Sequence, residues 1–121
     1  MSDISLLKKS LGLFKLKKVT KDTFLWSGKN VGYKRIFGGQ VMAQSLVAAY
    51  KTVNTQHFAH SFHSYFLRPG DMTKQIIFSV DSIRDGKSFT TRTVKAIQDN
   101  EVIFFLTCFK LMNKFSLIKG L

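Results

Sequence analysis

The sequence predicts a single α+β domain in which a long helix is wrapped by a curved antiparallel β-sheet. One weakly charged helical segment occupies residues 39–51, and long β-type segments joined by turns follow it as far as residue 109. The 121 residues contain one proline and neither a low-complexity linker nor an internal repeat. We therefore expect one continuous domain over residues 1–112 and a tail, open to disorder, over residues 113–121.

Two shorter signals precede the main helix. Ile4 and Leu7 are spaced as on one face of a short amphipathic helix, which we expect over residues 2–9. Residues 15–26 mix apolar and polar side chains and predict either a pair of short strands or an extended segment.

The clearest helix signal covers Gly39–Lys51, where alanines favour the helix and no proline interrupts it. Its polar residues carry almost no charge, so we expect the helix to be enclosed rather than to lie on a surface. The face expected to be buried consists of Val41, Met42, Ser45, Leu46 and Ala49.

Segments typical of long strands follow the helix. Most alternate apolar and polar side chains or are rich in β-branched and aromatic residues, whereas the last is apolar on both faces, as in the interior of a sheet. The expected strands are Phe58–Leu67, Gln75–Ile83, Ser88–Ile97 and Val102–Phe109. Turns are expected at residues 68–71, 84–87 and 98–100, which contain Pro-Gly, Asp-Gly and Asp-Asn pairs.

The chain is strongly basic, with 19 Lys and Arg against 7 Asp and Glu and a formal net charge of +12. Such a balance attracts polyanions such as nucleic acid, an anionic membrane face or a phosphorylated ligand. The charges are scattered and no nucleic-acid recognition motif is present, so we favour solvated charges over a nucleic-acid-binding module. The densest group is Lys15, Lys17, Lys18 and Lys21.

Cys108 is the single cysteine, which excludes an intramolecular disulfide and a metal site with several cysteine ligands. It lies in an apolar run, so a buried thiol is expected. No apolar stretch approaches the roughly 18 residues of a membrane span, and no signal peptide is expected. These features predict a protein of a reducing compartment, the cytoplasm, without a metal site.

Two runs of residues resemble the signature segments of the thioesterase II family of acyl-CoA thioesterases. They are RIFGGQVMAQSL at residues 35–46 and HSFHSYFLRPGD at residues 60–71. Shorter matches follow in order at residues 83–89, 94–98 and 103–104. The order and spacing of five segments make this resemblance much more specific than any single motif.

The resemblance implies a double hot-dog enzyme that hydrolyses fatty acyl-CoA, with these segments in the first of two fused hot-dog units. In the family, the Asp, Ser/Thr and Gln that position the hydrolytic water lie in the second unit, before which this sequence ends. After Phe109 the family has a glutamine and an acidic, histidine-containing linker, whereas Lys110–Lys114 follows here. We therefore expect the N-terminal hot-dog half alone, incomplete as a single-chain enzyme.

Three residues at the start of the main helix are candidates for binding the acyl-CoA that the resemblance implies. Gly38 and Gly39 can present backbone N–H groups and the positive end of the helix dipole to a carbonyl oxygen. The alternative is that these glycines only let the chain enter a buried helix past a strand. Gln40 can hydrogen-bond the substrate or a water, but its amide cannot act as a general base.

His60 and His63 are the only plausible bases in the matched segments. Three positions apart in a strand, they point to opposite faces unless the strand is bulged. We take His60 as the catalytic candidate and His63 as substrate-binding, although half-buried histidines bonded to the backbone are the more frequent case. The turn residues Asp71 and Asp85 are interpreted as turn-stabilising carboxylates.

Arginines outside the helix can meet the CoA phosphates through charge-assisted hydrogen bonds, or they can be solvated surface charges. The candidates are Arg68 and Arg84, together with Lys87 and Arg92. Neither a cofactor nor a metal is expected, because CoA enters as part of the substrate.

We keep two main functions open: a thioesterase unit, or a non-catalytic hot-dog module that binds acyl-CoA. A third, a basic nucleic-acid-binding module, is supported by charge alone. A lone unit leaves a sheet edge unpaired, so we expect a homo-oligomer or a separate second hot-dog unit as partner.

Overall fold

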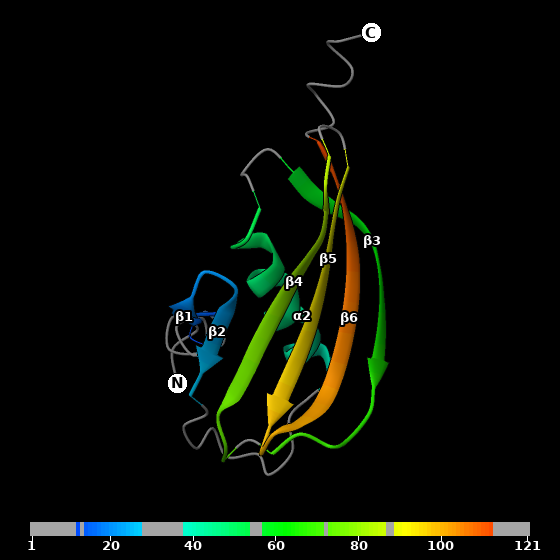
Figure 1. The fold of residues 1–121 in the computed structure, drawn as a ribbon. Coiled ribbons are helices and arrows are strands. Elements are labelled where there is room, and N and C mark those ends of the chain that lie inside the picture. Colours follow the sequence, from blue (N-terminus) through cyan, green and yellow to red (C-terminus); the bar gives the residue numbers. More distant parts are fainter. Residues whose placement is uncertain are drawn as a thin grey trace, which may run out of the picture.

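The computed structural model describes residues 12, 14–27, 38–53, 57–71, 73–86 and 89–112, with the backbone alone at 57–60 and 110–112. Within this part of the chain, strands form one antiparallel sheet in the order β1-β2-β4-β5-β6-β3, and α2 lies against one of its faces (Figure 1). The elements are β1 (Lys17–Thr20), β2 (Thr23–Trp26), α2 (Gly38–Tyr50), β3 (His57–Phe66), β4 (Ile76–Asp85), β5 (Phe89–Gln98) and β6 (Glu101–Met112). The predicted α+β class, a helix wrapped by a curved antiparallel sheet, is confirmed.

The strand pair predicted at residues 15–26 is present as β1 and β2, which excludes the alternative of an extended segment. The helix and the long strands match the predicted segments to within a few residues at each end. The largest difference is β6, which continues to Met112 because both neighbouring strands pair with its end. The expected helix at residues 2–9 and the tail at 113–121 lie outside the described residues.

The turn between β5 and β6 has the geometry that its sequence predicts. Asp99 and Asn100 have φ angles of 51° and 62°, and the strands pair from Gln98 to Glu101 on either side. Two successive residues with positive φ make a tight hairpin whose twist matches that of the strands. Asn and Asp tolerate this backbone region better than other non-glycine residues, which explains their presence here.

The core consists of side-chain rows that run across the sheet beneath α2. Antiparallel pairing brings partners onto the same face, so each row is continuous from strand to strand. Burying each large apolar side chain contributes roughly 1.5–3 kcal/mol. Two fully buried rows are Phe24–Phe78–Ala96–Phe104 and Val80–Val94–Leu106.

The buried face of α2 differs from the predicted one. Met42 and Leu46 are only partly buried, while Gln44, which was not among the residues expected to be buried, is fully buried. The small residues of the stripe let the sheet approach closely, and the Ser45 hydroxyl donates to the Val41 carbonyl at 2.8 Å. The buried stripe is Val41, Gln44, Ser45, Ala48 and Ala49.

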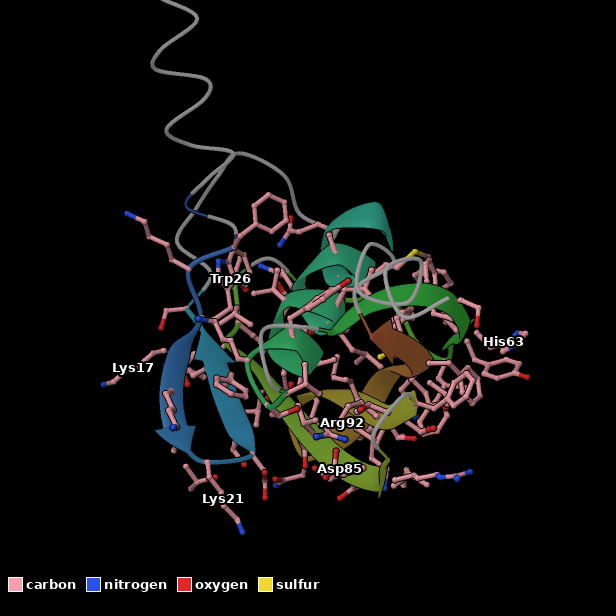
Figure 2. The ribbon with its side chains drawn as sticks, turned by 90° about the horizontal axis from the view of Figure 1, so that it is seen from above. Lys17, Lys21, Trp26, His63, Asp85 and Arg92 are labelled. Carbon is pink, nitrogen blue, oxygen red and sulfur yellow. The ribbon has the colours of Figure 1, made fainter. Side chains whose placement is uncertain are left out.

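Arg92 is buried at the C-terminal end of α2, with 3% of its side chain exposed. Its Nε donates to Thr52 Oγ1 at 2.8 Å and its Nη2 to the Thr52 carbonyl at 3.1 Å. Asp85 lies beside it, 2.7 Å from Nη2 (Figure 2). The guanidinium thus satisfies a carbonyl at the negative end of the helix dipole. The interpretation of Arg92 as a solvated or phosphate-binding charge is wrong, because the sheet buries it.

Candidate functional site

An open pocket of about 340 Å³ lies at the N-terminal end of α2, opposite the end that Arg92 occupies. The end of β3 with the turn after it, the start of β6, and the first turn of α2 each contribute part of its wall. Most of the lining is apolar. The lining residues are Gly38, Val41, Phe66, Leu67, Arg68, Pro69, Gly70, Ile103 and Phe104.

Pairing between β3 and β6 builds the apolar wall. Phe66 is the Cα partner of Phe104, and their ring centroids are 4.9 Å apart. The strand contact continues past β3, since the N–H groups of Leu67 and Arg68 both donate to the Ile103 carbonyl, at 2.9 and 3.2 Å. The proline turn that follows is therefore held rigidly against β6.

Gly38 lies where the start of α2 closely approaches the Phe66 side chain of β3. A Cβ at this position would be 3.0 Å from Cε1 and 3.2 Å from Cζ of the Phe66 ring, so a larger residue would require the ring to move. This supports the interpretation of Gly38 as a close-approach glycine. Gly38 also places the positive end of the α2 dipole at the pocket wall, and the first turn of α2 contains no acidic side chain. The two interpretations are therefore compatible.

Arg68 is the charged residue of the lining. Its Nη1 donates to the Val102 carbonyl at 2.9 Å, and its Nε lies 3.3 Å from Glu101 Oε2. About half of each side chain in this pair is exposed, so the pair contributes little to stability and leaves the guanidinium in reach of an anionic ligand. The predicted candidates Gly38 and Arg68 are thus brought together in one pocket.

Gln40 lies in the same turn of α2 but does not line the pocket. Its Nε2 donates to Gln44 Oε1 at 3.4 Å, a weak hydrogen bond directed toward the core. Gly39 is exposed next to it.

The two histidines lie on β3, away from the pocket. The β3–β6 register shifts between Ala59 and Ser61, so His60 occupies a bulge, about 20 Å along the strand from Phe66 at its other end. His63 pairs with Thr107, which alternates with the buried residues Leu106 and Cys108, so His63 faces the outer side of the sheet. There it makes an edge-to-face contact with Phe109, with ring centroids 6.4 Å apart. Figure 2 shows His63 at the margin of the molecule.

Arg84 lies near the C-terminal end of β4, at the end of the molecule that Arg92 occupies. The Arg92 Nη1 donates to the Arg84 carbonyl oxygen at 3.4 Å. The structure therefore does not bring Arg84 to the pocket. Asp85, beside it, pairs with Arg92 rather than serving the turn alone. Lys87 lies outside the described residues.

Asp71 closes the turn after β3, as the sequence predicts. Its Oδ1 accepts hydrogen bonds from the Thr73 hydroxyl at 2.6 Å and the Thr73 N–H at 2.9 Å. These bonds, with a smaller contribution from Lys74, lower the pKa of the Asp71 carboxyl below its ordinary value of 3.8. The Gln98 side chain holds the same turn through the N–H and carbonyl of Asp71.

The chemical groups of the pocket favour binding. Its described lining offers apolar walls, a helix N-terminus and a guanidinium, but no side chain that could act as a general base or nucleophile. Across the residues that the structure describes, no group of three His, Cys, Asp or Glu side chains is placed to hold a metal ion. Nor does this part of the chain contain a helix long and apolar enough to cross a membrane.

Sequence reasoning missed the apolar wall of the pocket and the Arg92–Thr52 contact. Phe66 and Ile103 each appear in segments that were recognised, but nothing local indicates that they meet. The only usable signal was the apolar pattern of both strands, which is consistent with several pairings.

Comparison with known proteins gives consistent matches over most of the chain. The sequence profile described as acyl-CoA thioesterase N-terminal domain matches residues 27–112. Acyl-CoA thioesterase 2 of Haemophilus influenzae is 40% identical over 107 residues, which cover 88% of this chain and 37% of that protein. Human acyl-coenzyme A thioesterase 8 is 44% identical over 85 residues, or 69% of this chain and 27% of that protein.

Solved structures agree with these matches. The crystal structure of an acyl-CoA thioesterase II from Mycobacterium marinum superposes with a TM-score of 0.77 at 36% identity, covering 86% of this chain and 38% of that chain. The E. coli PaaI protein, at 16% identity and a TM-score of 0.69, shares the fold alone and is covered over 83% of its length. The hot-dog fold is thereby confirmed, and the chain spans less than half the length of the relatives it matches at higher identity.

Proposed function

The chain belongs to the acyl-CoA thioesterase N-terminal domain family, and from this premise we propose that it is one hot-dog unit of an acyl-CoA thioesterase. The match over residues 27–112 carries the proposal, because it includes every element that builds the pocket. The reaction would convert fatty acyl-CoA and water to free fatty acid and CoA, acting in the cytoplasm. Cys108 is buried and forms no disulfide, which is compatible with a reducing compartment.

Hydrolysis requires water oxygen to bond to the thioester carbon, the C–S bond to break, and CoA to leave as the thiol. In this proposal the apolar wall around Phe66 and Phe104 holds the acyl chain near the thioester. The backbone N–H groups of Gly38 and Gly39 donate hydrogen bonds to the carbonyl oxygen as negative charge develops on it. Arg68 provides the positive charge for a CoA phosphate, and Gln40 orients a polar group of the substrate after release from Gln44.

The pocket's described lining lacks a base, so we assign the activation of water to a second hot-dog unit. The same observation favours the second candidate function, a non-catalytic module that binds acyl-CoA without hydrolysing it. His60 is the candidate base of this chain, so its removal tests whether this half can hydrolyse acyl-CoA without the second unit.

The two candidates are separated by measuring CoA release and acyl-CoA binding on the same purified chain. CoA release is followed for a series of acyl-chain lengths, with His60→Ala alongside. Turnover that is lost in the variant would place the chemistry in this half. Binding without turnover would exclude hydrolysis by this half alone, and CoA release on adding a second hot-dog unit would then separate a thioesterase half from a non-catalytic module. A folded chain that does not bind acyl-CoA would contradict both.

Gly38→Ala tests whether the pocket is the binding site. The added Cβ meets the Phe66 ring, so we expect acyl-CoA affinity to fall several-fold while the exposed ring moves aside and stability changes by less than about 1 kcal/mol. Adding Phe66→Leu should restore the space and recover affinity, as measured by titration calorimetry. Unchanged affinity in Gly38→Ala would place the site elsewhere.

We further propose that β3 is where the partner unit binds. β3 is an edge strand whose ten residues include no Lys, Arg, Asp or Glu. Phe62, Tyr65 and Phe66 are 40%, 62% and 57% exposed along it. Such an edge supports pairing with a strand of a second copy or of a separate hot-dog unit.

A further inference from the structure

A group of lysines gathers on the sheet edge opposite β3. All four residues of β1 are exposed, and Lys17 and Lys21 extend outward from the β1–β2 hairpin (Figure 2). Asp22 is the only acidic residue between positions 14 and 27. We call this the hairpin basic surface; it consists of Lys15, Lys17, Lys18 and Lys21, with the apolar residues Phe14 and Val19 among them.

Among the residues that the structure describes, none of these lysines forms an ion pair. The ion pairs among the described residues join Arg68 to Glu101, Lys74 to Asp99 and Arg92 to Asp85, all away from the hairpin. Clustered like charges that are not paired raise the local positive potential and attract an anionic partner.

Apolar side chains are also exposed in this short segment of the chain. Val19 is 56% exposed and Phe14 is 39% exposed. Lysines interspersed with exposed aromatic and aliphatic side chains are typical of segments that rest on a lipid surface, where the charges meet headgroups and the apolar groups enter the boundary with the acyl chains. A nucleic-acid surface would instead be expected to offer a groove or several stacking aromatic rings, and the hairpin offers Phe14 alone.

The position of the surface leaves it free in an assembly. β1 and β3 are the two outermost strands of the sheet, on opposite sides in Figure 1. A partner that pairs with β3 therefore does not cover β1. We infer that the hairpin basic surface docks the protein onto the surface of a bilayer that contains anionic lipid.

Lysines on a short edge strand also prevent edge-to-edge aggregation. The two roles predict different results when charge is removed. Loss of edge protection would make the chain self-associate, whereas loss of a docking surface would weaken vesicle binding in a protein that remains dispersed.

The test is co-sedimentation of the full chain with vesicles of phosphatidylcholine, with and without phosphatidylserine. We expect binding only to the phosphatidylserine vesicles, falling as salt is raised. Each lysine near an anionic surface contributes about five-fold in partitioning, so Lys17→Gln with Lys21→Gln should weaken binding roughly 25-fold. Lys17→Arg with Lys21→Arg should bind as the unchanged protein does, and Val19→Ser should bind several-fold less.

The matched control is Lys51→Gln with Lys95→Gln, which removes the same charge from exposed positions outside the hairpin. The affinity of this control variant for phosphatidylserine vesicles should fall less than about three-fold, since the hairpin basic surface is intact. If the two double glutamine variants lose vesicle affinity equally, net charge alone explains the binding and the inference is overturned. Equal binding to both vesicle types would also overturn it, as would lysine-dependent binding of duplex DNA without binding of vesicles.

Discussion

Single residues stabilise the two ends of the molecule by different means. At the C-terminal end of α2, the buried Arg92 bonds to Thr52 and to Asp85. At the pocket end, the Asp71 carboxylate and the Gln98 amide hold the turn after β3. Both arrangements satisfy backbone groups through side-chain hydrogen bonds, so each has a measurable effect on stability.

Arg92→Met should lower the free energy of unfolding by about 1–3 kcal/mol, because the Thr52 carbonyl loses its buried donor. Asp85 also loses its partner, but its side chain is 65% exposed and stays hydrated. Urea denaturation measures the change. Arg84→Met, at an exposed neighbouring position, is the control and should change stability by about 0.5 kcal/mol or less. A loss of similar size in both variants would contradict the role assigned to Arg92.

Thr73→Val should raise the pKa of Asp71 toward its ordinary value of 3.8, because it removes the hydroxyl donor, the largest cause of the lowering, and leaves the backbone N–H donor in place. In the unchanged protein the folded-state pKa is lowered, so the carboxylate adds stability above pH 3.8 and loses it as pH falls through the folded-state pKa. The stability difference between protein and variant should therefore shrink in acid. NMR titration of the Asp71 carboxyl measures its pKa in both proteins, and acid unfolding measures the stability difference. An Asp71 pKa that is the same in the variant would contradict the role given to the Thr73 hydroxyl.

The two edge strands have opposite characters. β1 has four residues, two of them lysine, whereas β3 has ten residues without a charged side chain. Short, charged edges resist pairing, while long, apolar edges invite it. The sheet is therefore expected to associate through β3 and not through β1.

Phe62→Lys with Tyr65→Lys should convert an associating chain into a monomer, because each new charge would have to be buried when β3 pairs with a partner. Analytical ultracentrifugation over a range of concentrations measures the change. Val19→Lys with Thr20→Lys places the same charges on β1 and should leave association unchanged. If the unchanged chain is already a stable monomer, the proposed role of β3 is wrong.

The whole molecule carries a net charge of +12 on 121 residues, so mutual repulsion acts on the folded state. Raising the salt concentration from about 0.01 to about 0.1 M shortens the Debye length from about 30 to about 10 Å and screens this repulsion. We expect the urea midpoint of unfolding to rise over this range. Lys17→Glu with Lys21→Glu lowers the net charge and should show a smaller rise; a midpoint that falls with salt would contradict the expectation.

Much of the local structure was predictable from sequence because it depends on neighbours along the chain. The small, uncharged residues of Gly39–Lys51 indicated an enclosed helix, and the Asp99-Asn100 pair indicated the turn with positive φ angles. Even so, the buried stripe of α2 was misassigned by a few residues. Gln44 became a core residue because the sheet covers that side of the helix.

The candidate site was only partly predictable. Gly38 and Arg68, one from each signature run, line the same pocket. His63 instead lies on the outer face of the sheet, and Arg84 lies at the end of the sheet opposite the pocket. A side chain's face depends on strand register, and the shift at His60 changes that register within β3. No local pattern specifies where such a bulge occurs.

The sequence by itself determined the class of fold, the order of helix and strands, the excess of positive charge and the family resemblance, because these depend on composition and on residues close together in the chain. Only the tertiary structure decided that β3 pairs with β6, which brings Phe66 to Phe104. It also decided that Arg92 is buried against Thr52, and that β1 with its lysines and β3 without Lys, Arg, Asp or Glu lie at opposite edges of the sheet. The physical reason is that these contacts join residues distant in sequence, and their free energy depends on which strands become neighbours when the sheet closes around the helix.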